Sequence, residues 1–216
     1  MKRRWVIVGA VCTALICAGI IVRTQRNNRR LAKWAEVYRI RAERGDAKSQ
    51  YALGAMYYYG KGVPKDYAEA VHWYRKSAEQ GDANAQYSLS YVYHEGQGVP
   101  QDDLEAARWC RKAAEQGNAM AQDALGLIYW RGEGVSPDNA EAVRWYRKSA
   151  EQGYTRAQYD LAYMYYYGYG VPRDRIQAHD LFQQAADHGN EDAKRALECY
   201  RNGISIDPGA GLRGLQ

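Results

Sequence analysis

The strongest constraint on the fold is a set of residues that recur every 36 positions along most of the chain. One such column consists of Gly45, Gly81, Gly117, Gly153 and Gly189. Other columns with the same interval consist of Gly60, Gly96, Gly132 and Gly168, and of Trp73, Trp109 and Trp145. A fixed period of about 20 to 50 residues indicates a solenoid, in which each unit buries its apolar face only against its neighbours. The period therefore favours a binding function over catalysis.

Each repeat unit is predicted to be two helices joined by a turn. In the first unit, apolar residues keep helical spacing from Ala47 to Tyr59, and two glycines and Pro64 then interrupt the pattern. A second helix is expected to begin after Asp66, because Asp66 followed by Glu69 matches a capping box that satisfies free N–H groups in the first turn. Gly81 is expected to end this helix, since glycine adopts the left-handed conformation readily.

The repeats define the expected domain organisation. Residues 31–44 are predicted to be an N-terminal capping helix and residues 189–201 a C-terminal one, since terminal units of solenoids end the stack in a more polar surface. Residues 202–216 contain four glycines, one proline and no period, so we expect a flexible tail. The four complete units, together spanning 45–188, are 45–80, 81–116, 117–152 and 153–188.

These columns resemble the Sel-one-like repeat (SLR) family, a branch of the tetratricopeptide-like solenoids. The resemblance covers about residues 31–200 and rests on an Ala-x-x-x-Leu-Gly-x-x-Tyr run, a Gly-x-Gly-Val turn and an Ala-x-x-Trp-x-x-Lys-x-Ala helix. It implies an all-α, right-handed α-solenoid that acts as an adaptor for proteins or peptides, often in bacterial envelope or signalling assemblies. The chain departs from the family pattern where Ser90 and Ala162 replace a glycine and Leu181 replaces the tryptophan.

Residues 1–30 are predicted to anchor the chain in a membrane. Trp5 to Val22 contains 18 residues without a charge, and as a helix it would span roughly 27 Å, close to the ~30 Å hydrocarbon core. A cleaved signal peptide stays open as an alternative, although Ile20 to Val22 continue the apolar run past the small residues that cleavage requires. We therefore expect a single transmembrane helix, and the family resemblance implies that the membrane is a bacterial inner membrane. Basic residues flank it almost equally; the short basic N-terminus favours a periplasmic solenoid, and a cytoplasmic one stays open.

The net charge of +5 does not describe the repeats. Eight of the 30 Lys and Arg residues lie in residues 1–33, which contain no acid, so residues 34–216 carry 22 basic and 25 acidic residues, a net charge of −3. A nucleic-acid partner is therefore not expected. The sequence also lacks metal-ligand motifs, and its Gly-x-Gly turns lack the third glycine of a dinucleotide loop, so we expect no metal, cofactor or enzyme activity. Cys110 is expected to be a small buried apolar residue.

The binding surface is predicted on the side of each first helix that faces away from the second helix. At about 100° per residue, positions 51, 55 and 58 lie opposite positions 49, 53 and 56, which are expected to be buried. In a stack of helix pairs, this side should line a concave groove, and its aromatic residues are typical of binding hot spots. The predicted groove residues are Tyr51, Tyr58, Tyr87, Tyr91, His94, Asp123, Trp130, Tyr159, Tyr163 and Tyr166. The alternative is that these tyrosines pack laterally between adjacent first helices.

The sequence thus favours a membrane-tethered, non-enzymatic scaffold that binds a protein or peptide in its groove. Tyr91, Trp130 and Tyr166 are the expected anchors of that partner. Two alternatives stay open: a peptidoglycan- or glycan-binding module or hydrolase-like SLR protein, since aromatic side chains also stack on sugar rings, and a purely structural spacer.

Overall fold

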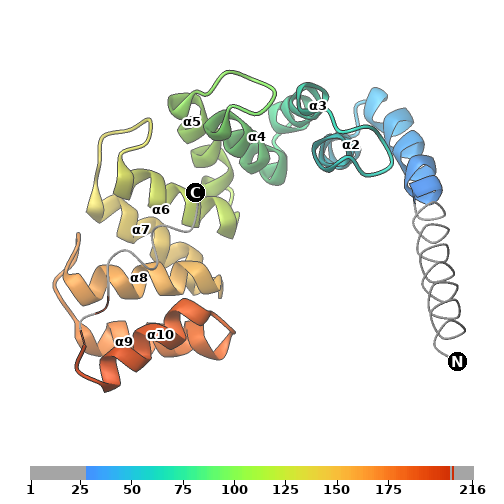
Figure 1. The fold of residues 1–216 in the computed structure, drawn as a ribbon. Helices are drawn as coiled ribbons and strands as arrows, with labels where there is room; N and C mark the ends of the chain where they lie inside the picture. The colour runs from blue at the N-terminus through green and yellow to red at the C-terminus, as the bar shows by residue number, and fades with distance from the viewer. Residues whose placement is uncertain (1–27, 205, 207–216) are drawn as a thin grey trace, which may run out of the picture. The chain divides into compact units, whose positions relative to one another are not determined.

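A computed structural model of the chain describes residues 28–204 and 206, and within these residues the regular structure is entirely helical (Figure 1). Residues 28–43 are helical. The helices that follow are α2 (Ala47–Tyr59), α3 (Tyr67–Glu79), α4 (Ala83–Glu95), α5 (Asp103–Glu115), α6 (Ala119–Arg131), α7 (Asn139–Glu151), α8 (Thr155–Tyr167), α9 (Arg175–Asp187) and α10 (Glu191–Arg201). The predicted transmembrane segment, Trp5 to Val22, lies outside the described residues. Within them, every helix is too short or too polar to cross a membrane.

The predicted caps determine where the helices begin and end. The Asp66 carboxylate accepts a hydrogen bond of 3.1 Å from the backbone N–H of Glu69, as the capping box predicts. Gly81 has a φ of 95°, which confirms the expected left-handed conformation after α3. Tyr154 begins α8 without a side-chain cap bond, because its phenol cannot replace the Asp or Asn found there in the other repeats.

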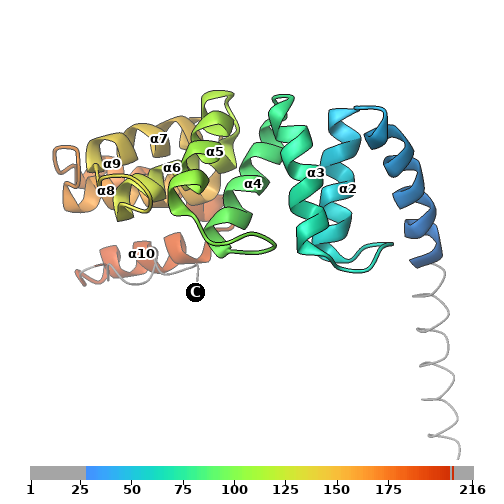
Figure 2. The ribbon, with the colours of Figure 1, turned by 90° about the horizontal axis from the view of Figure 1, so that it is seen from above.

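The chain forms two compact units, Met1–Gln80 and Gly81–Gln216. In the first unit, α2 packs against α3 as one helix pair. The second unit contains the pairs α4/α5, α6/α7 and α8/α9, followed by α10, and each helix packs against the next one along the chain (Figures 1 and 2). The second unit is thus built from consecutive helix pairs, as expected of a solenoid, and the first contains one such pair.

Two of the repeats bring their helices together at a glycine. A Cβ atom on Gly126 of α6 would lie 2.7 Å from Cδ1 of Tyr146 on α7, which is closer than packed carbon atoms approach. Gly54 and Tyr74 have the same relationship between α2 and α3, also at 2.7 Å. The absence of a side chain therefore lets the tyrosine ring lie directly against the neighbouring helix.

A column of buried glutamines, which the sequence interpretation missed, links neighbouring helices through hydrogen bonds. Gln122 accepts a hydrogen bond of 2.7 Å from Gln152 and donates one of 3.1 Å to the carbonyl of Ala114. Its equivalents at the same 36-residue spacing are Gln50, Gln86 and Gln158. In the last repeat, His188 stands where Gln152 stands in the third, and Oε1 of Gln158 has no hydrogen-bond partner among the described residues. The column thus has a structural role.

Candidate binding cleft

The predicted groove residues do not form one exposed strip. In the first compact unit, Tyr51 and Tyr58 are half-buried. The ring of Tyr58 lies 4.8 Å from that of Tyr59 and 5.2 Å from that of Tyr67, measured between centroids. Tyr58 is therefore part of an aromatic cluster formed by its own repeat.

In α8, the expectation of an open aromatic face is corrected by the structure. Tyr159, Tyr163 and Tyr166 are all buried, and Tyr163 is 0% exposed. The physical reason is that the chain covers this side itself. The ring of Tyr167 lies 4.7 Å from that of Tyr163, and the Tyr167 hydroxyl donates a hydrogen bond to the carbonyl of Ile206.

The third repeat departs from the prediction in a different way. Asp123, which was expected on the open face of α6, is only 2% exposed. Trp130, at the other end of the same helix, is half-buried and packs against the core of the second unit. Asp123 is buried because Arg156, at the start of α8, lies against it and takes part in an ion pair.

Several predicted residues nevertheless meet at a cleft between α4 and α6, within the second compact unit. This α4–α6 cleft has a volume of about 70 Å³. Tyr91 is one of its more accessible residues, at 37% exposure. The side chains that define the cleft include Tyr87, Tyr91 and His94 of α4, Asp123, Leu127 and Arg131 of α6, and Arg156 of α8.

Two ion pairs lie at the partly exposed edge of the α4–α6 cleft. Nδ1 of His94 lies 2.8 Å from Oδ1 of Asp103, which connects α4 to the first turn of α5. Nη1 of Arg131 lies 3.3 Å from Oε1 of Glu133, in the turn that follows α6. One pair thus joins a carboxylate to an imidazole, and the other joins a carboxylate to a guanidinium.

The inner end of the cleft is formed by a cluster of three ionisable side chains, of which Asp123 and Asp160 are buried and Arg156 is 38% exposed. Nε of Arg156 lies 3.4 Å from Oδ2 of Asp123 and 3.7 Å from Oδ2 of Asp160. Burial raises the pKa of Asp123 to about 7, although the guanidinium of Arg156 acts in the opposite direction. Burial also raises the pKa of Asp160 well above its usual range, and the charge of Asp123 adds to the effect.

The α4–α6 cleft combines aromatic and aliphatic sides with two carboxyl groups at its inner end. Within the described part of the chain, no three His, Cys, Asp or Glu side chains are grouped so as to hold a metal ion. Cys110, behind the cleft, is fully buried as predicted, and burial raises the pKa of its thiol to about 12, so the thiol stays protonated at neutral pH.

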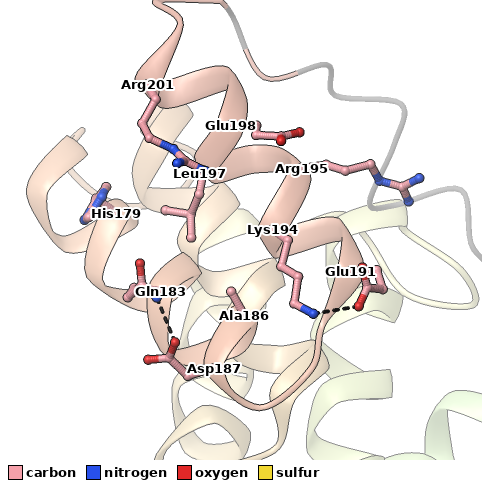
Figure 3. A pocket seen from close by; sticks show the side chains of 10 residues that line it. All are labelled: His179, Gln183, Ala186, Asp187, Glu191, Lys194, Arg195, Leu197, Glu198 and Arg201. Carbon is pink, nitrogen blue, oxygen red and sulfur yellow. Dashed lines mark hydrogen bonds and ion pairs between the residues drawn. The ribbon is translucent and has the colours of Figure 1, made fainter.

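A second groove, of about 670 Å³, lies between α9 and α10 (Figure 3). Its side chains are polar and pair locally: Lys194 contacts Glu191 at 2.8 Å, and Gln183 donates to Asp187 at 2.8 Å. His179 also lines this groove. The residues at the equivalent position of the preceding repeats are apolar and buried, namely Val71, Ala107 and Val143. A polar residue in that column is what the end of a repeat array requires, so this groove is best explained as the polar terminus of the stack.

Comparisons with known proteins agree with the architecture. A family model described as Sel1 repeat matches residues 47–82, 83–118, 119–154 and 155–190. Comparison with curated protein sequences finds no match.

Solved structures give the same result. A protective antigen of uropathogenic Escherichia coli that displays an SLR fold is 41% identical over 84% of this chain, with a TM-score of 0.75, and the chain spans 40% of that protein. A Sel1 repeat protein from Oxalobacter formigenes is 36% identical, covering 78% of this chain and 68% of its own, with a TM-score of 0.70. An immunity protein from Pseudomonas aeruginosa, 23% identical over 87% of this chain and 72% of its own, shares the fold with a TM-score of 0.52.

Proposed function

We propose that this chain is a membrane-tethered, non-enzymatic scaffold that binds a segment of another protein in the α4–α6 cleft. The proposal starts from the fact that the chain belongs to the Sel1 repeat family. Sel1 repeat proteins generally act as scaffolds for protein–protein interaction. The part of this proposal that is specific to the chain is the location of the binding surface. It replaces the continuous groove expected from the sequence with one cleft between the first helices of two neighbouring repeats.

The observation that carries the proposal is the composition and accessibility of the α4–α6 cleft. Tyr91 is more than one third exposed, whereas the equivalent Tyr163 in α8 is fully buried. Tyrosine loses little side-chain entropy on binding and contributes a large contact area, which explains its enrichment in binding hot spots. Tyr87 and Leu127 add aromatic and aliphatic surface to the same cleft.

The membrane tether and a role in bacterial envelope assembly or signalling are further parts of the proposal. They rest on the uncharged segment Trp5 to Val22 and on the basic residues around it. In this arrangement the repeats would be held close to the membrane, on the periplasmic side, where they would gather a protein partner.

The proposed function can be tested by affinity capture with the full-length chain extracted from membranes. We expect the double substitution Tyr91→Ala and His94→Ala to reduce recovery of the bound protein at least about tenfold, because hot-spot residues carry most of the binding free energy. Arg144→Ala is the matched control, since Arg144 is exposed on α7 and lies outside the cleft. Unchanged recovery with a variant whose circular dichroism and melting temperature match the wild type would rule out the cleft as the binding surface.

A further inference from the structure

We propose that the α4–α6 cleft accepts the side chain of a lysine from the partner, and that the lysine ammonium group pairs with the carboxylate of Asp123. This inference rests on the proposed function, because it names the chemistry of the segment that the cleft would hold. It is carried by the balance of charge at the inner end of the cleft and by the shape of the space that leads there.

The cluster of Asp123, Asp160 and Arg156 contains one positive charge for two carboxyl groups. Arg156 is the partner of both Asp123 and Asp160, at 3.4 Å and 3.7 Å. A guanidinium can neutralise only one of them, so the cluster lacks one positive charge when both acids are ionised. A buried carboxylate must be paired or neutralised, so the second acid either keeps a proton, as the raised pKa of Asp160 indicates, or is balanced by an incoming cation.

The groups at the edge of the cleft do not supply the missing charge. His94 is paired with Asp103, and Arg131 is paired with Glu133. The cleft lining therefore holds three acidic side chains, Asp103, Asp123 and Glu133, against the two arginines Arg131 and Arg156, so a neutral His94 leaves one negative charge in excess. This complementarity favours a basic partner group over an acidic one.

Of the two carboxylates in the cluster, Asp123 is the one that lines the cleft, and Arg156 lines it as well. Its side chain is 4% exposed, and its Oδ1 atom is buried without a hydrogen-bond partner among the described residues. An unpaired carboxylate oxygen in such a place is a strong acceptor for a charged donor. An incoming ammonium group would satisfy Oδ1 while Oδ2 remains with Arg156.

The shape of the cleft fits the rest of a lysine side chain. The space is small, about 70 Å³, and Tyr87 and Leu127 provide apolar surface on opposite helices. Burial raises the pKa of Tyr87 to about 12, so its phenol stays neutral at the pH of the experiment. Asp123, and not a tyrosinate, would therefore be the anionic partner of the ammonium group. A lysine carries a compact charge on a flexible aliphatic stem, which can lie along such surfaces, whereas a guanidinium is larger and planar.

The inference can be tested with n-butylammonium chloride, which reproduces the end of a lysine side chain, on the full-length chain in detergent solution. Binding is measured by saturation-transfer NMR at pH 8 and constant ionic strength, with 1-butanol and sodium butyrate as uncharged and anionic analogues. We expect butylammonium to bind at least tenfold more tightly than either analogue. Asp123→Asn should weaken that binding at least tenfold, and Glu115→Gln, which removes one exposed acid on α5, should leave it unchanged.

A second variant keeps the test independent of how Asp123→Asn folds. Ala124 lines the cleft next to Asp123, so Ala124→Lys should place an internal ammonium group near the carboxylate and abolish binding of the probe. Wild-type affinity in either cleft variant, or equal binding of butanol and butylammonium, would overturn the inference. If the lysine analogue fails to bind while partner capture still depends on Tyr91 and His94, the lysine site is wrong and the proposed function stands. If capture is also independent of these residues, the proposed function itself is wrong.

Discussion

At the scale of single residues, burial and charge conflict at Asp123. Its carboxyl group is out of water, and it shares Arg156 with Asp160. Burial raises its pKa to about 7 from 3.8. Between about pH 4 and pH 7, the folded protein therefore holds a proton that the unfolded chain releases, and the stability linked to this proton is lost as the pH rises through the folded-state pKa.

Asp123→Asn should remove much of this pH dependence, because an amide does not titrate. We expect the free energy of unfolding of the wild type, relative to the variant, to fall by on the order of 2 kcal/mol between pH 4.5 and pH 7.5. Urea unfolding of both proteins at several pH values gives the difference between their free energies of unfolding. Ionisable groups that titrate alike in the two proteins do not contribute to this difference. Parallel pH profiles would show that Asp123 ionises normally in the folded protein.

Gly126 is a second residue whose role follows from its contacts. A methyl group added there would meet the ring of Tyr146, which is itself fully buried and cannot move aside easily. We therefore expect Gly126→Ala to destabilise the protein by about 1 to 3 kcal/mol, despite the higher helix propensity of alanine. Urea unfolding provides the measurement, and an equal or higher midpoint would refute the proposed contact. In the second repeat, Ser90 replaces this glycine, and the smaller Cys110 replaces the tyrosine.

At the scale of the helices, the caps are the features that define each element. The Asp138 carboxylate accepts hydrogen bonds of 2.9 Å and 3.0 Å from the N–H groups of Ala140 and Glu141 at the start of α7. Asp138→Ala leaves these donors without the carboxylate and should lower the free energy of unfolding by about 1 kcal/mol, whereas Asp138→Asn should retain most of the stability. Thermal unfolding of the two variants tests this expectation, which fails if alanine and asparagine have the same effect.

The helices could be predicted from the sequence because their signals are local. The predicted first helix, 47 to 59, matches α2 residue for residue, since Asp46 and Gly60 cap it at either end. The burial of α8 could not be predicted in this way. The residues that cover Tyr163, namely Tyr167 and Tyr169, occupy columns that hold other residue types in the second and third repeats. Periodicity predicts which residues are equivalent, and it does not show what covers each copy.

The charged cluster did leave a signal in the sequence that our interpretation missed. Asp123 interrupts a column that otherwise contains Tyr51, Tyr87 and Tyr159. Asp160 interrupts a column of small residues in the same manner. Each departure is unremarkable alone, and only the stacking of α6 against the start of α8 brings both acids to Arg156.

At the scale of the whole molecule, the proposed scaffold depends on the N-terminal segment to hold the repeats at a membrane. Deleting residues 1–30 should move the chain from the membrane fraction, where it should resist a carbonate wash, to the soluble fraction. This follows from the length and apolarity of Trp5 to Val22. A reporter fused after Gln216 should be active on the periplasmic side. Release of the intact full-length chain by carbonate would contradict the anchor, and a cytoplasmic reporter signal would reverse the orientation.

The central claim is that a partner docks in the α4–α6 cleft, and site-specific photocrosslinking in living cells tests it most directly. The full-length chain would carry p-benzoylphenylalanine in place of Tyr91 at the cleft or, as the matched control, in place of the exposed Arg144 on α7. We predict a discrete crosslinked adduct with one partner protein from position 91 alone, and its loss when Ala124→Lys is added to fill the cleft. The same adducts from both positions, or an adduct at position 91 that persists with the cleft filled, would contradict the account.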